Sequence, residues 1–443
     1  MEREHLSNLL QNRQFKMVRN ILKTMNEVDI ATLLDDFDDK EMAFAFRLIP
    51  KDKAAEVFAN MNDNMQSYLV EVFSEKELED ILDDLYIDDT VDMLEDLPAN
   101  LVTRVLDTVS QSKRELLNLL LQYPDDSTGS IMTTEYISLR QFMTVAESMA
   151  HIKRTGIHKE SIYTCYVTEK RKLIGIVSAK DLLTSDDEMH IADLMKTNII
   201  SVNTHTDQEE VADLFRKYNL IALPVLDRDE HLVGIVTFDD AIDVMVEEAT
   251  EDISKMAAVS PSEKPYFETS VFTHARNRFV WLLVLMISAT ITGAIIGHYE
   301  AAFAALPLLV SFIPMLMNTG GSGGAQTSAL IIRGLALKEI TFGDMPRVVF
   351  KEFRVSILVG IILALANGIR VYIIYQNFSL AFVIAASLVG IMIGSKLTGC
   401  VLPLCAKKIG MDPAIMAAPL ITTIVDTFSI LIYFNIAIYV FQL

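Results

Sequence analysis

The chain has 443 residues, with 38 Lys and Arg against 59 Asp and Glu, and its formal net charge of −21 argues against nucleic acid as a partner. The charge is uneven: residues 1–270 carry 27 basic and 53 acidic side chains (27 − 53 = −26), and residues 271–443 carry 11 and 6 (11 − 6 = +5). Only the second part has long uncharged stretches, such as 279–297 and 371–395. Because a helix of about 20 apolar residues spans the hydrocarbon core, the sequence predicts an integral membrane protein with a large acidic soluble half.

Cysteine usage and the N-terminus both point to a cytoplasmic soluble half. The three cysteines are Cys165, Cys400 and Cys405, and the last two lie in an apolar run, so a disulfide framework is excluded. The first residues, MEREHLSNLL, contain no apolar core of signal-peptide length. We therefore expect the first 270 residues to stay in the reducing cytoplasm.

Residues 1 to about 125 have the pattern of helices alone. Apolar residues recur at spacings of three and four with Asp and Glu between them, as in LEDILDDLYIDDTVDMLEDL. A weak repeat supports this prediction, because Ile49 and Pro50 recur 48 residues later as Leu97 and Pro98. Each proline stands where a new helix can begin. We predict a short all-α helical superhelix.

From about residue 130 the pattern changes to short strands that alternate with helices, in two similar copies. IMTTEYISL is followed by LMKTNIISV, and KLIGIVSAKDLL by HLVGIVTFDDAI. The offsets are 63 residues from Met132 to Met195 and 59 residues from Gly175 to Gly234. This arrangement resembles a pair of cystathionine-β-synthase-type (CBS) domains, whose G-h-h-[ST]-x-x-D motif ends each copy. We predict an α/β tandem CBS pair.

The CBS resemblance implies a nucleotide site. Asp181 and Asp240 end the two motifs and stand where members of that family can hold a ribose. The alternative is that the motif only shapes the fold and that the pair packs as a regulatory module without a ligand. A long connecting helix from about 239 to 258 then leads toward the membrane part and is suited to carry movement to it.

The last part of the chain predicts five membrane spans. They cover about 279–298, 301–333, 348–370, 378–405 and 414–441, and prolines and four glycines interrupt the second. Basic residues gather before the first span, between the second and third, and between the fourth and fifth. Because cytoplasmic loops carry the excess of Lys and Arg, we expect these loops inside and the C-terminus outside the cell.

Asp426 is the only ionisable side chain between Pro413 and Leu443, and it lies near the middle of the fifth span. A carboxylate at that depth costs about 3 kcal/mol unless it faces water, a cation or a partner. The alternative is a buried Asp bonded to Thr422 or Thr423, but intramembrane acids generally mark ion paths. Thr422 lies one helical turn away, so we predict that both residues belong to an ion pathway.

The second span carries the run PMLMNTGGSGGAQ. Asn318, Ser322 and Gln326 recur at every fourth residue and therefore share one helix face. Glycines alone serve close helix packing, but a polar stripe beside them does not follow from packing. We predict that Asn318, Gly320, Gly321 and Ser322 also line the ion pathway. Oxygen ligands without a Cys or His pair suit a hard cation such as Mg²⁺.

Together these features resemble the MgtE family of magnesium channels over essentially the whole chain. The family's P-x-x-x-x-T-G-G-N-x-G-x-Q pattern is matched from Pro314 to Gln326, except that Ser322 replaces its asparagine. The matches to its other patterns are Glu248 to Ile253 for the run E-A-T-E-D-I, and Asp412 to Ala414, Pro419 and Asp426 around span five. The resemblance implies a homodimer with the pore on its two-fold axis. The serine puts the ion selectivity in question.

The acidic half carries a candidate sensor for regulatory Mg²⁺. Asp240, Asp243, Glu247 and Glu251 follow one helix face at spacings of three and four, where like charges repel. An ordinary solvated face is the alternative. The resemblance implies carboxylates that share Mg²⁺ and hold the channel shut. From the stripe and the resemblance, the predicted metal ligands are Glu56, Asp88, Asp92, Glu209, Asp240, Asp243, Glu248, Glu251, Asp252 and Asp412.

The chain is accordingly predicted to be multidomain. The predicted parts are a helical acidic N domain (1–128), two CBS domains (129–190 and 191–245), a connecting (plug) helix and linker (246–270) and an all-α membrane domain of five transmembrane helices (271–443). ATP at the CBS pair is a further expected cofactor beside Mg²⁺.

Several other functions are excluded because their motifs are missing. An intramembrane metalloprotease needs H-E-x-x-H and an ATP-driven pump needs a phosphate loop, but the chain has neither that motif nor a Gly-Lys pair. Two alternatives to an Mg²⁺ channel stay open: a cation-coupled carrier for Mg²⁺ or another divalent ion such as Mn²⁺ or Co²⁺, and a membrane-anchored nucleotide sensor that does not transport.

Overall fold

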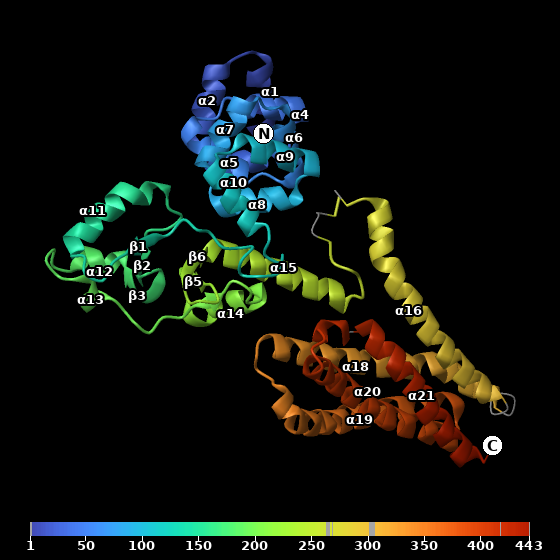
Figure 1. The fold of residues 1–443 in the computed structure, drawn as a ribbon. Coiled ribbons are helices and arrows are strands. Elements are labelled where there is room, and N and C mark those ends of the chain that lie inside the picture. Colours follow the sequence, from blue (N-terminus) through green and yellow to red (C-terminus); the bar gives the residue numbers. More distant parts are fainter. Residues whose placement is uncertain (1, 263–265, 268, 301–305, 417, 443) are drawn as a thin grey trace. The chain divides into compact units, whose positions relative to one another are not determined.

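The computed structural model describes residues 2–262, 266–267, 269–300, 306–416 and 418–442 (Figure 1). The chain divides into two compact units, Met1–Val246 and Glu247–Leu443. Each unit is described by itself below.

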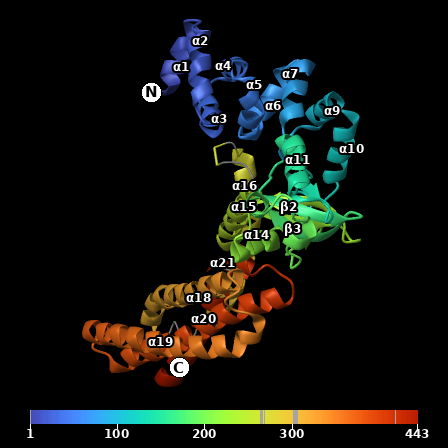
Figure 2. The same cartoon turned by 90° about the vertical axis from the view of Figure 1, so that its left-hand side faces the viewer.

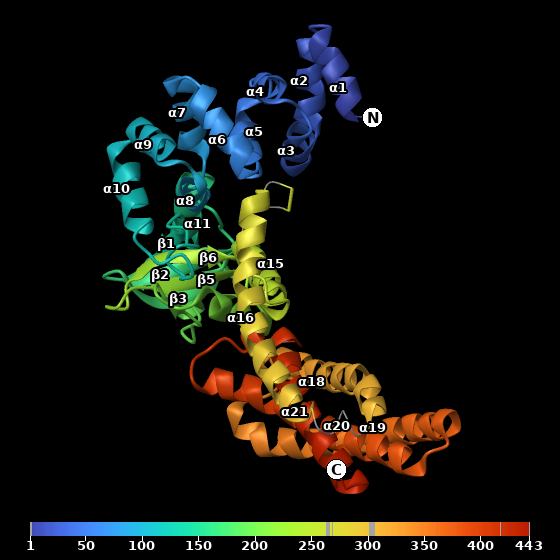
Figure 3. The same ribbon diagram turned by 90° about the vertical axis from the view of Figure 1, so that its right-hand side faces the viewer.

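The first unit begins with ten short helices, which confirms the prediction of helices alone. They are α1 (Glu2–Gln11), α2 (Phe15–Thr24), α3 (Glu27–Asp35), α4 (Asp39–Phe46), α5 (Lys51–Ala59), α6 (Asp63–Val72), α7 (Glu75–Asp84), α8 (Ile87–Asp96), α9 (Ala99–Thr108) and α10 (Gln111–Leu120). They follow one another along a curved row (Figures 2 and 3). Pro50 and Pro98 directly precede α5 and α9, so the prolines of the repeat do stand at helix starts.

The two CBS copies have the same strand order and direction. The elements of the first copy are β1 (Ile137–Leu139), α11 (Val145–Thr155), a 3₁₀ turn η1 (Gly156–His158), β2 (Thr164–Glu169), β3 (Lys172–Ser178) and α12 (Ala179–Thr184). Those of the second are α13 (Ile191–Leu194), β4 (Val202–Asn203), α14 (Gln208–Tyr218), β5 (Ala222–Leu226), β6 (Leu232–Thr237) and α15 (Phe238–Met256). In each sheet the first strand is parallel to the second, and the second is antiparallel to the third. This shared topology confirms the duplication that the sequence repeat predicted.

The repeated glycines and methionines join the two copies. A Cβ on Gly175 would lie 2.5 Å from Sδ of Met195, and a Cβ on Gly234 would lie 2.8 Å from Sδ of Met132. Each methionine therefore packs on the glycine of the other copy, where no larger residue fits. Backbone hydrogen bonds repeat this exchange, between Ile176 and Lys196 and between Thr133 and Ile235.

The second unit contains the long apolar helices. Its elements after α15 are α16 (Val271–His298), η2 (Pro307–Phe312), α18 (Ile313–Ala336), η3 (Phe342–Asp344), α19 (Met345–Tyr375), α20 (Phe378–Lys408), η4 (Pro413–Met416) and α21 (Ala418–Phe441). Helices α18, α20 and α21 pack against one another, while α19 packs on α20 and α16 on α21 (Figure 3). Within the described residues, four segments are long and apolar enough to cross a membrane: α16, Phe342–Tyr375, α20 and α21.

The second predicted span differs from its expected form. Residues 301–305, where it was expected to begin, lie outside the described residues. From Ile313 to Ala336 the chain forms one continuous helix through all four glycines, so the prediction of an interruption there was wrong. Glycine weakens an isolated helix by about 1 kcal/mol per residue. Packing of this helix on two neighbours outweighs that cost, as the contacts of its glycines show below.

Candidate functional site

The first unit gathers carboxylates from its helical domain and from both CBS copies. Asp88 lies in the first turn of α8 and is only 6% exposed, and its carboxylate accepts a hydrogen bond from the backbone N–H of Asp89 at 3.1 Å. Asp240 lies in the first turn of α15 and is half-buried. Burial, followed by the charge of Asp240, raises the pKa of Asp88 well above its usual range. The fold thus brings together two of the predicted metal ligands.

Four further acids belong to this group: Asp89, Glu135, Glu160 and Asp239. Together with Asp88 and Asp240 they form what we call the acidic cluster. Burial is the largest cause of each of the following shifts, and neighbouring carboxylates add to it. The pKa rises to about 8 for Glu160 and to about 6 for Asp89 and Asp240. A group with such values either holds protons or attracts cations at neutral pH.

The only lysine among the groups that act on Asp89 is Lys113 of α10. Its Nζ donates to the backbone carbonyls of Leu82 (2.5 Å) and Leu85 (2.8 Å), and burial lowers its pKa. Lys159 also acts on Glu135, but two ammonium groups cannot balance six carboxylates. The acidic cluster therefore keeps an excess of negative charge that a divalent cation would offset.

The sequence analysis missed four members of the acidic cluster. Glu135 and Glu160 lie in the first CBS copy, Asp89 follows Asp88, and Asp239 precedes Asp240. The backbone N–H of Ile87, at the start of α8, donates to Glu135 at 3.3 Å, and this contact joins residues 48 positions apart. No local pattern encodes such a contact. The paired Asp-Asp sequences were the signal that was available.

The other predicted ligands of the first unit lie on its surface. Glu56, Asp92, Glu209 and Asp243 are exposed. Burial, followed by the charge of Asp239, raises the pKa of Asp243, which places Asp243 beside the acidic cluster. The charge of Glu56 contributes to the raised pKa of Tyr86 after burial, Glu160 and Glu135.

In the second unit, a lysine lies between two of the predicted metal ligands. Nζ of Lys255 is 2.7 Å from a carboxylate oxygen of Glu251 and 2.8 Å from one of Asp412. The other Asp412 oxygen accepts the N–H of Ala414 at 2.8 Å. Glu248 and Asp252, on the same helix, are half-buried. Lys255 thus ties the end of α15 to the loop before α21.

The acids that end the two CBS motifs hold the start of a helix. Oγ of Ser178 donates to Asp181 at 2.7 Å, and Oγ1 of Thr237 donates to Asp240 at 2.5 Å. These contacts explain structurally the spacing that the two motifs share, because the hydroxyl and the acid together cap the start of the helix. Hydrogen bonds from Ser178 lower the pKa of Asp181, whereas at Asp240 burial outweighs the matching bonds from Thr237 and raises the pKa to about 6.

The four glycines between positions 320 and 324 of α18 are buried against neighbouring helices. A Cβ on Gly321 would lie 3.0 Å from Thr422 of α21, and one on Gly323 would lie 2.8 Å from Met392 of α20. Oγ of Ser395 in α20 also donates to the carbonyl of Gly320. The glycines let the three helices approach closely.

The predicted polar stripe of α18 lies on the opposite side from these contacts. Asn318, Ser322 and Gln326 are exposed, as is Pro314 on the same face. On α21, Asp426 and Thr422 are half-buried. The hydroxyls of Thr422 and Thr423 both donate to the Pro419 carbonyl, at 2.9 and 2.8 Å, so neither serves Asp426 in the described part of the chain. This finding speaks against a merely structural pairing of Asp426.

A second charged group inside the helix bundle escaped the sequence analysis. Lys396 of α20 is 6% exposed, and its Nζ donates to Oγ1 of Thr327 at 3.2 Å. Thr327 in turn donates to Glu352 of α19 at 3.1 Å. The sequence contained a signal for this group, because a lone lysine within an apolar run generally marks a functional or structural site.

Comparison with known proteins adds three kinds of likeness. The family pattern of MgtE, a divalent cation transporter, matches residues 313–436, that of the MgtE intracellular N domain matches 2–126, and that of the CBS domain matches 129–188 and 191–247. The magnesium transporter MgtE of Thermus thermophilus is 34% identical over 438 residues, 98% of this chain and 97% of that protein. Its namesake in Bacillus subtilis is 33% identical over 97% of this chain and 95% of that protein.

A solved structure resembles the soluble half. It is the crystal structure of the cytosolic domain of the Mg²⁺ channel MgtE in complex with ATP, which is 34% identical and has a TM-score of 0.52. The match covers 54% of this chain and 98% of that domain.

Proposed function

The chain belongs to the MgtE family of divalent cation transporters, and from this premise we propose that it is a homodimeric Mg²⁺ channel that closes when cytoplasmic Mg²⁺ occupies its acidic domains. The relatives named above are magnesium transporters, and their likeness extends over nearly the whole chain. The proposal places the N-terminal half in the cytoplasm and the C-terminus outside the cell.

The observation that carries the proposal is the division of α18 into two faces. Its glycines are buried against α20 and α21, while Asn318, Ser322 and Gln326 are exposed. A stripe of amide and hydroxyl groups on a membrane helix is unfavourable against lipid, so it faces water or a partner. A second copy of the chain, packed against this face, would enclose a path lined by oxygen atoms.

Asp426 and Thr422 supply the charge and a hydroxyl for that path in the proposed dimer. Thr422 contacts Gly321 directly, because the glycine has no side chain to keep the two helices apart. In the proposal this close approach brings α21 next to the pore. Two copies of Asp426 would balance the charge of one Mg²⁺ that keeps most of its water, as this ion does in proteins. Gly320 and Gly321 then act through close packing rather than as ligands.

The acidic cluster is the proposed sensor. Its carboxylates come from three segments that are distant in sequence, so a bound Mg²⁺ would hold the helical domain and both CBS copies in one arrangement. Glu56, Asp92, Glu209 and Asp243 lie outside its buried part and serve as outer ligands in this proposal. Glu248, Glu251, Asp252 and Asp412 form a second set next to the membrane domain.

ATP is the proposed second ligand, at the CBS pair; the solved cytosolic domain described above is a complex with ATP. Of the two motif acids, Asp181 is suited to a nucleotide because it lies outside the acidic cluster. Asp240 lies within the cluster, whose charge repels a triphosphate. We therefore assign the nucleotide to Asp181 and Mg²⁺ to Asp240.

Ion flux into liposomes that hold the purified full-length protein tests the proposed function. The unmodified chain is expected to admit Mg²⁺, and Asp426→Asn is expected to abolish the flux because the amide removes the charge that offsets partial dehydration. Glu339→Gln, an exposed carboxylate in the loop after α18, is the matched control and should leave flux unchanged. Full flux in Asp426→Asn would remove this residue from the pathway, and no flux in the unmodified chain would contradict the channel.

A further inference from the structure

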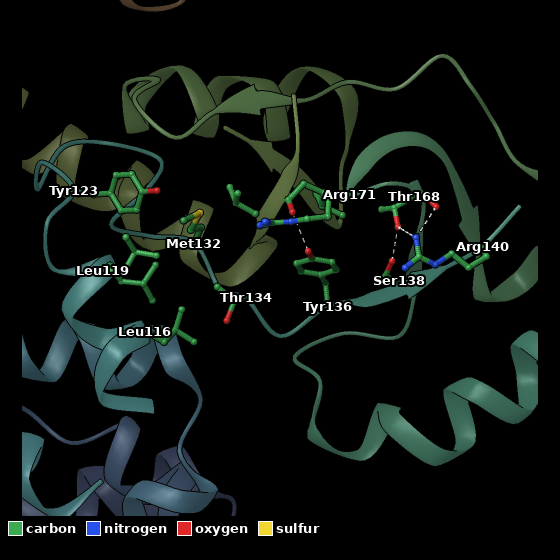
Figure 4. Close-up of a pocket in the computed structure, with 13 residues that line it drawn as sticks. Leu116, Leu119, Tyr123, Met132, Thr134, Tyr136, Ser138, Arg140, Thr168 and Arg171 are labelled. Atoms are coloured by element: carbon green, nitrogen blue, oxygen red, sulfur yellow. Dashed lines mark hydrogen bonds between the residues drawn. The ribbon is translucent and has the colours of Figure 1, made fainter. Parts of the chain in front are cut away.

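A cleft lies between α10 and the CBS strands, away from both motif acids. It has a volume of about 310 Å³, and its wall is formed by residues of α10, of the segment before β1, and of β1, β2 and β6. In Figure 4 the labelled side chains fall into three groups. Leu116, Leu119, Tyr123 and Met132 lie on one side, Tyr136 and Arg171 in the middle, and Ser138, Thr168 and Arg140 on the other side.

The two arginines of the cleft have no acidic partner among the described residues. Arg140 reaches the carbonyl and Oγ1 of Thr168, at 3.3 and 3.5 Å, and the Thr168 hydroxyl also bonds to Ser138 at 2.9 Å. Both arginines are exposed, and no carboxylate stands among the residues that line the cleft. Guanidinium and hydroxyl groups together are the donors that bind phosphate.

The turn that carries Arg171 is strained. Lys170 and Arg171 connect β2 to β3, and both have positive φ angles, 50° and 70°. A two-residue hairpin with positive φ at both positions normally uses Asn and Gly, because side chains with a Cβ pay for this conformation. Strain of this kind is usually retained where it positions a functional group. Here it holds Arg171 at the cleft, while Lys170 does not line it.

The opposite wall is apolar. Leu119 of α10 is 53% exposed, and Leu116 and the buried Met132 line the same side of the cleft. An apolar wall facing two guanidinium groups suits a ligand that has an apolar end and an anionic end. Inorganic phosphate alone would leave the leucines uncovered.

We propose that this cleft binds a small organic phosphate, with its phosphate group at Arg140 and Arg171 and its apolar or aromatic body against Leu116 and Leu119. The site is separate from the CBS motif acids, because neither Asp181 nor Asp240 lines it. Since its walls come from the helical domain and from both CBS copies, a bound ligand would link them. This inference does not depend on ion transport by the chain.

Binding of phenyl phosphate to the purified full-length protein, measured by calorimetry, tests the proposal. Phenyl phosphate is expected to bind more tightly than inorganic phosphate or phenol, since it alone of the three combines a phosphate group with an aromatic ring. Arg171→Gly should weaken its binding roughly tenfold or more, because a paired charge-assisted hydrogen bond is lost. The same substitution relieves the positive φ, so thermal stability should be unchanged or higher.

Lys170→Gly is the matched control. It removes the same charge and relieves the same strain one residue earlier, but it should leave the affinity within about twofold because Lys170 lies outside the cleft. Asp181→Asn should likewise leave phenyl phosphate binding unchanged, which separates this site from a nucleotide site at the CBS motif. The proposal is overturned if phenyl phosphate shows no saturable binding at millimolar concentration, or if Arg171→Gly and Lys170→Gly weaken it equally.

Discussion

The ammonium group of Lys255 lies 2.8 Å from the carboxylate of Asp412, and this ion pair connects the last turn of α15 to the loop before α21. The same ammonium is 2.7 Å from Glu251. Both acids were predicted to bind regulatory Mg²⁺. In the structure a lysine already neutralises part of their charge, so a Mg²⁺ ion at these two carboxylates, as proposed above, would compete with Lys255.

Removing this competitor should make the channel more sensitive to Mg²⁺. In Lys255→Met, the two acids keep their positions without a counter-charge, and partly exposed ion pairs of this kind contribute about 1 kcal/mol. An energy of about 1 kcal/mol corresponds to a roughly fivefold change in affinity. We therefore expect half-maximal inhibition of flux at a Mg²⁺ concentration roughly fivefold lower than in the unmodified chain. Lys407→Met, which changes an exposed lysine in the last turn of α20, is the control. An unchanged concentration for Lys255→Met would mean that Mg²⁺ does not bind at Glu251 and Asp412.

Neutralising the acids of the connecting helix should have the opposite effect. In the triple variant Glu248→Gln, Glu251→Gln and Asp252→Asn, Mg²⁺ loses its ligands next to the membrane domain. In the unmodified protein, Mg²⁺ should slow proteolysis around residues 125 and 260, because a bridging ion draws the acidic surfaces together, whereas monovalent salt only screens them. The triple variant should lose this protection and close less completely at millimolar Mg²⁺. Protection that survives in the variant would show that the sensor lies elsewhere.

The acidic cluster should make the soluble half pH-dependent. The pKa values of Glu160 (about 8), Asp89 and Asp240 (both about 6) are raised in the folded chain, so the folded state binds protons more tightly than the unfolded state. The contribution of these three groups to stability is therefore greatest below the ordinary carboxyl pKa and is lost as the pH rises from about 4 to about 8. Mg²⁺ should restore it at pH 8 and have little effect at pH 5, because protonated carboxyls do not bind the ion.

Hydrogen exchange of α8 and α15 in the full-length protein, corrected for the intrinsic rate at each pH, measures this dependence. Glu160→Gln removes the member whose pKa is raised to about 8 and should flatten the profile above pH 6. Glu169, an exposed acid at the end of β2, is changed to Gln as the control. Equal Mg²⁺ protection at pH 5 and pH 8 would contradict the role of these carboxylates.

Ser322→Asn restores the residue that the family pattern has at this position. If Ser322 faces the ion in the dimer, the longer amide should change the ratio of Mg²⁺ to Mn²⁺ or Ca²⁺ uptake, because selectivity depends on cavity size and on the number of ligands. Competition between the ions in the liposome assay measures the ratio. A ratio identical to that of the unmodified chain would place Ser322 away from the ion.

The close contact of α18 and α20 predicts a difference between two glycines. A Cβ on Gly399 would collide with the carbonyl oxygen of Gly324, whereas a Cβ on Gly293 of α16 would meet nothing within 4 Å. Gly399→Ala should therefore destabilise the membrane domain by about 1 to 3 kcal/mol. Gly293→Ala should be neutral or stabilising, because alanine is the better helix former. Thermal unfolding in detergent compares them, and equal effects would argue against the tight packing.

Local patterns in the sequence were sufficient for the order of domains. Apolar spacings of three and four predicted the helices of the first part, because they relate residues within one or two turns of each other. The apolar runs gave the membrane part for the same reason. The CBS pair was predicted because each copy repeats the same short motifs. The four glycines of α18 misled the prediction, since intrinsic propensity argues against a helix that packing against α20 and α21 nevertheless stabilises.

The sequence by itself determined the parts of this protein: an acidic soluble half, a duplicated α/β unit, a membrane domain with one deep acid at Asp426, and the likeness to a family. Only the tertiary structure decided which charges meet. It placed Glu135 and Glu160 beside Asp88, inserted Lys255 between Glu251 and Asp412, and left Arg171 in a cleft without an acid. These relationships join residues far apart in the chain, and electrostatic energy depends on distance in space and on burial, neither of which local sequence specifies.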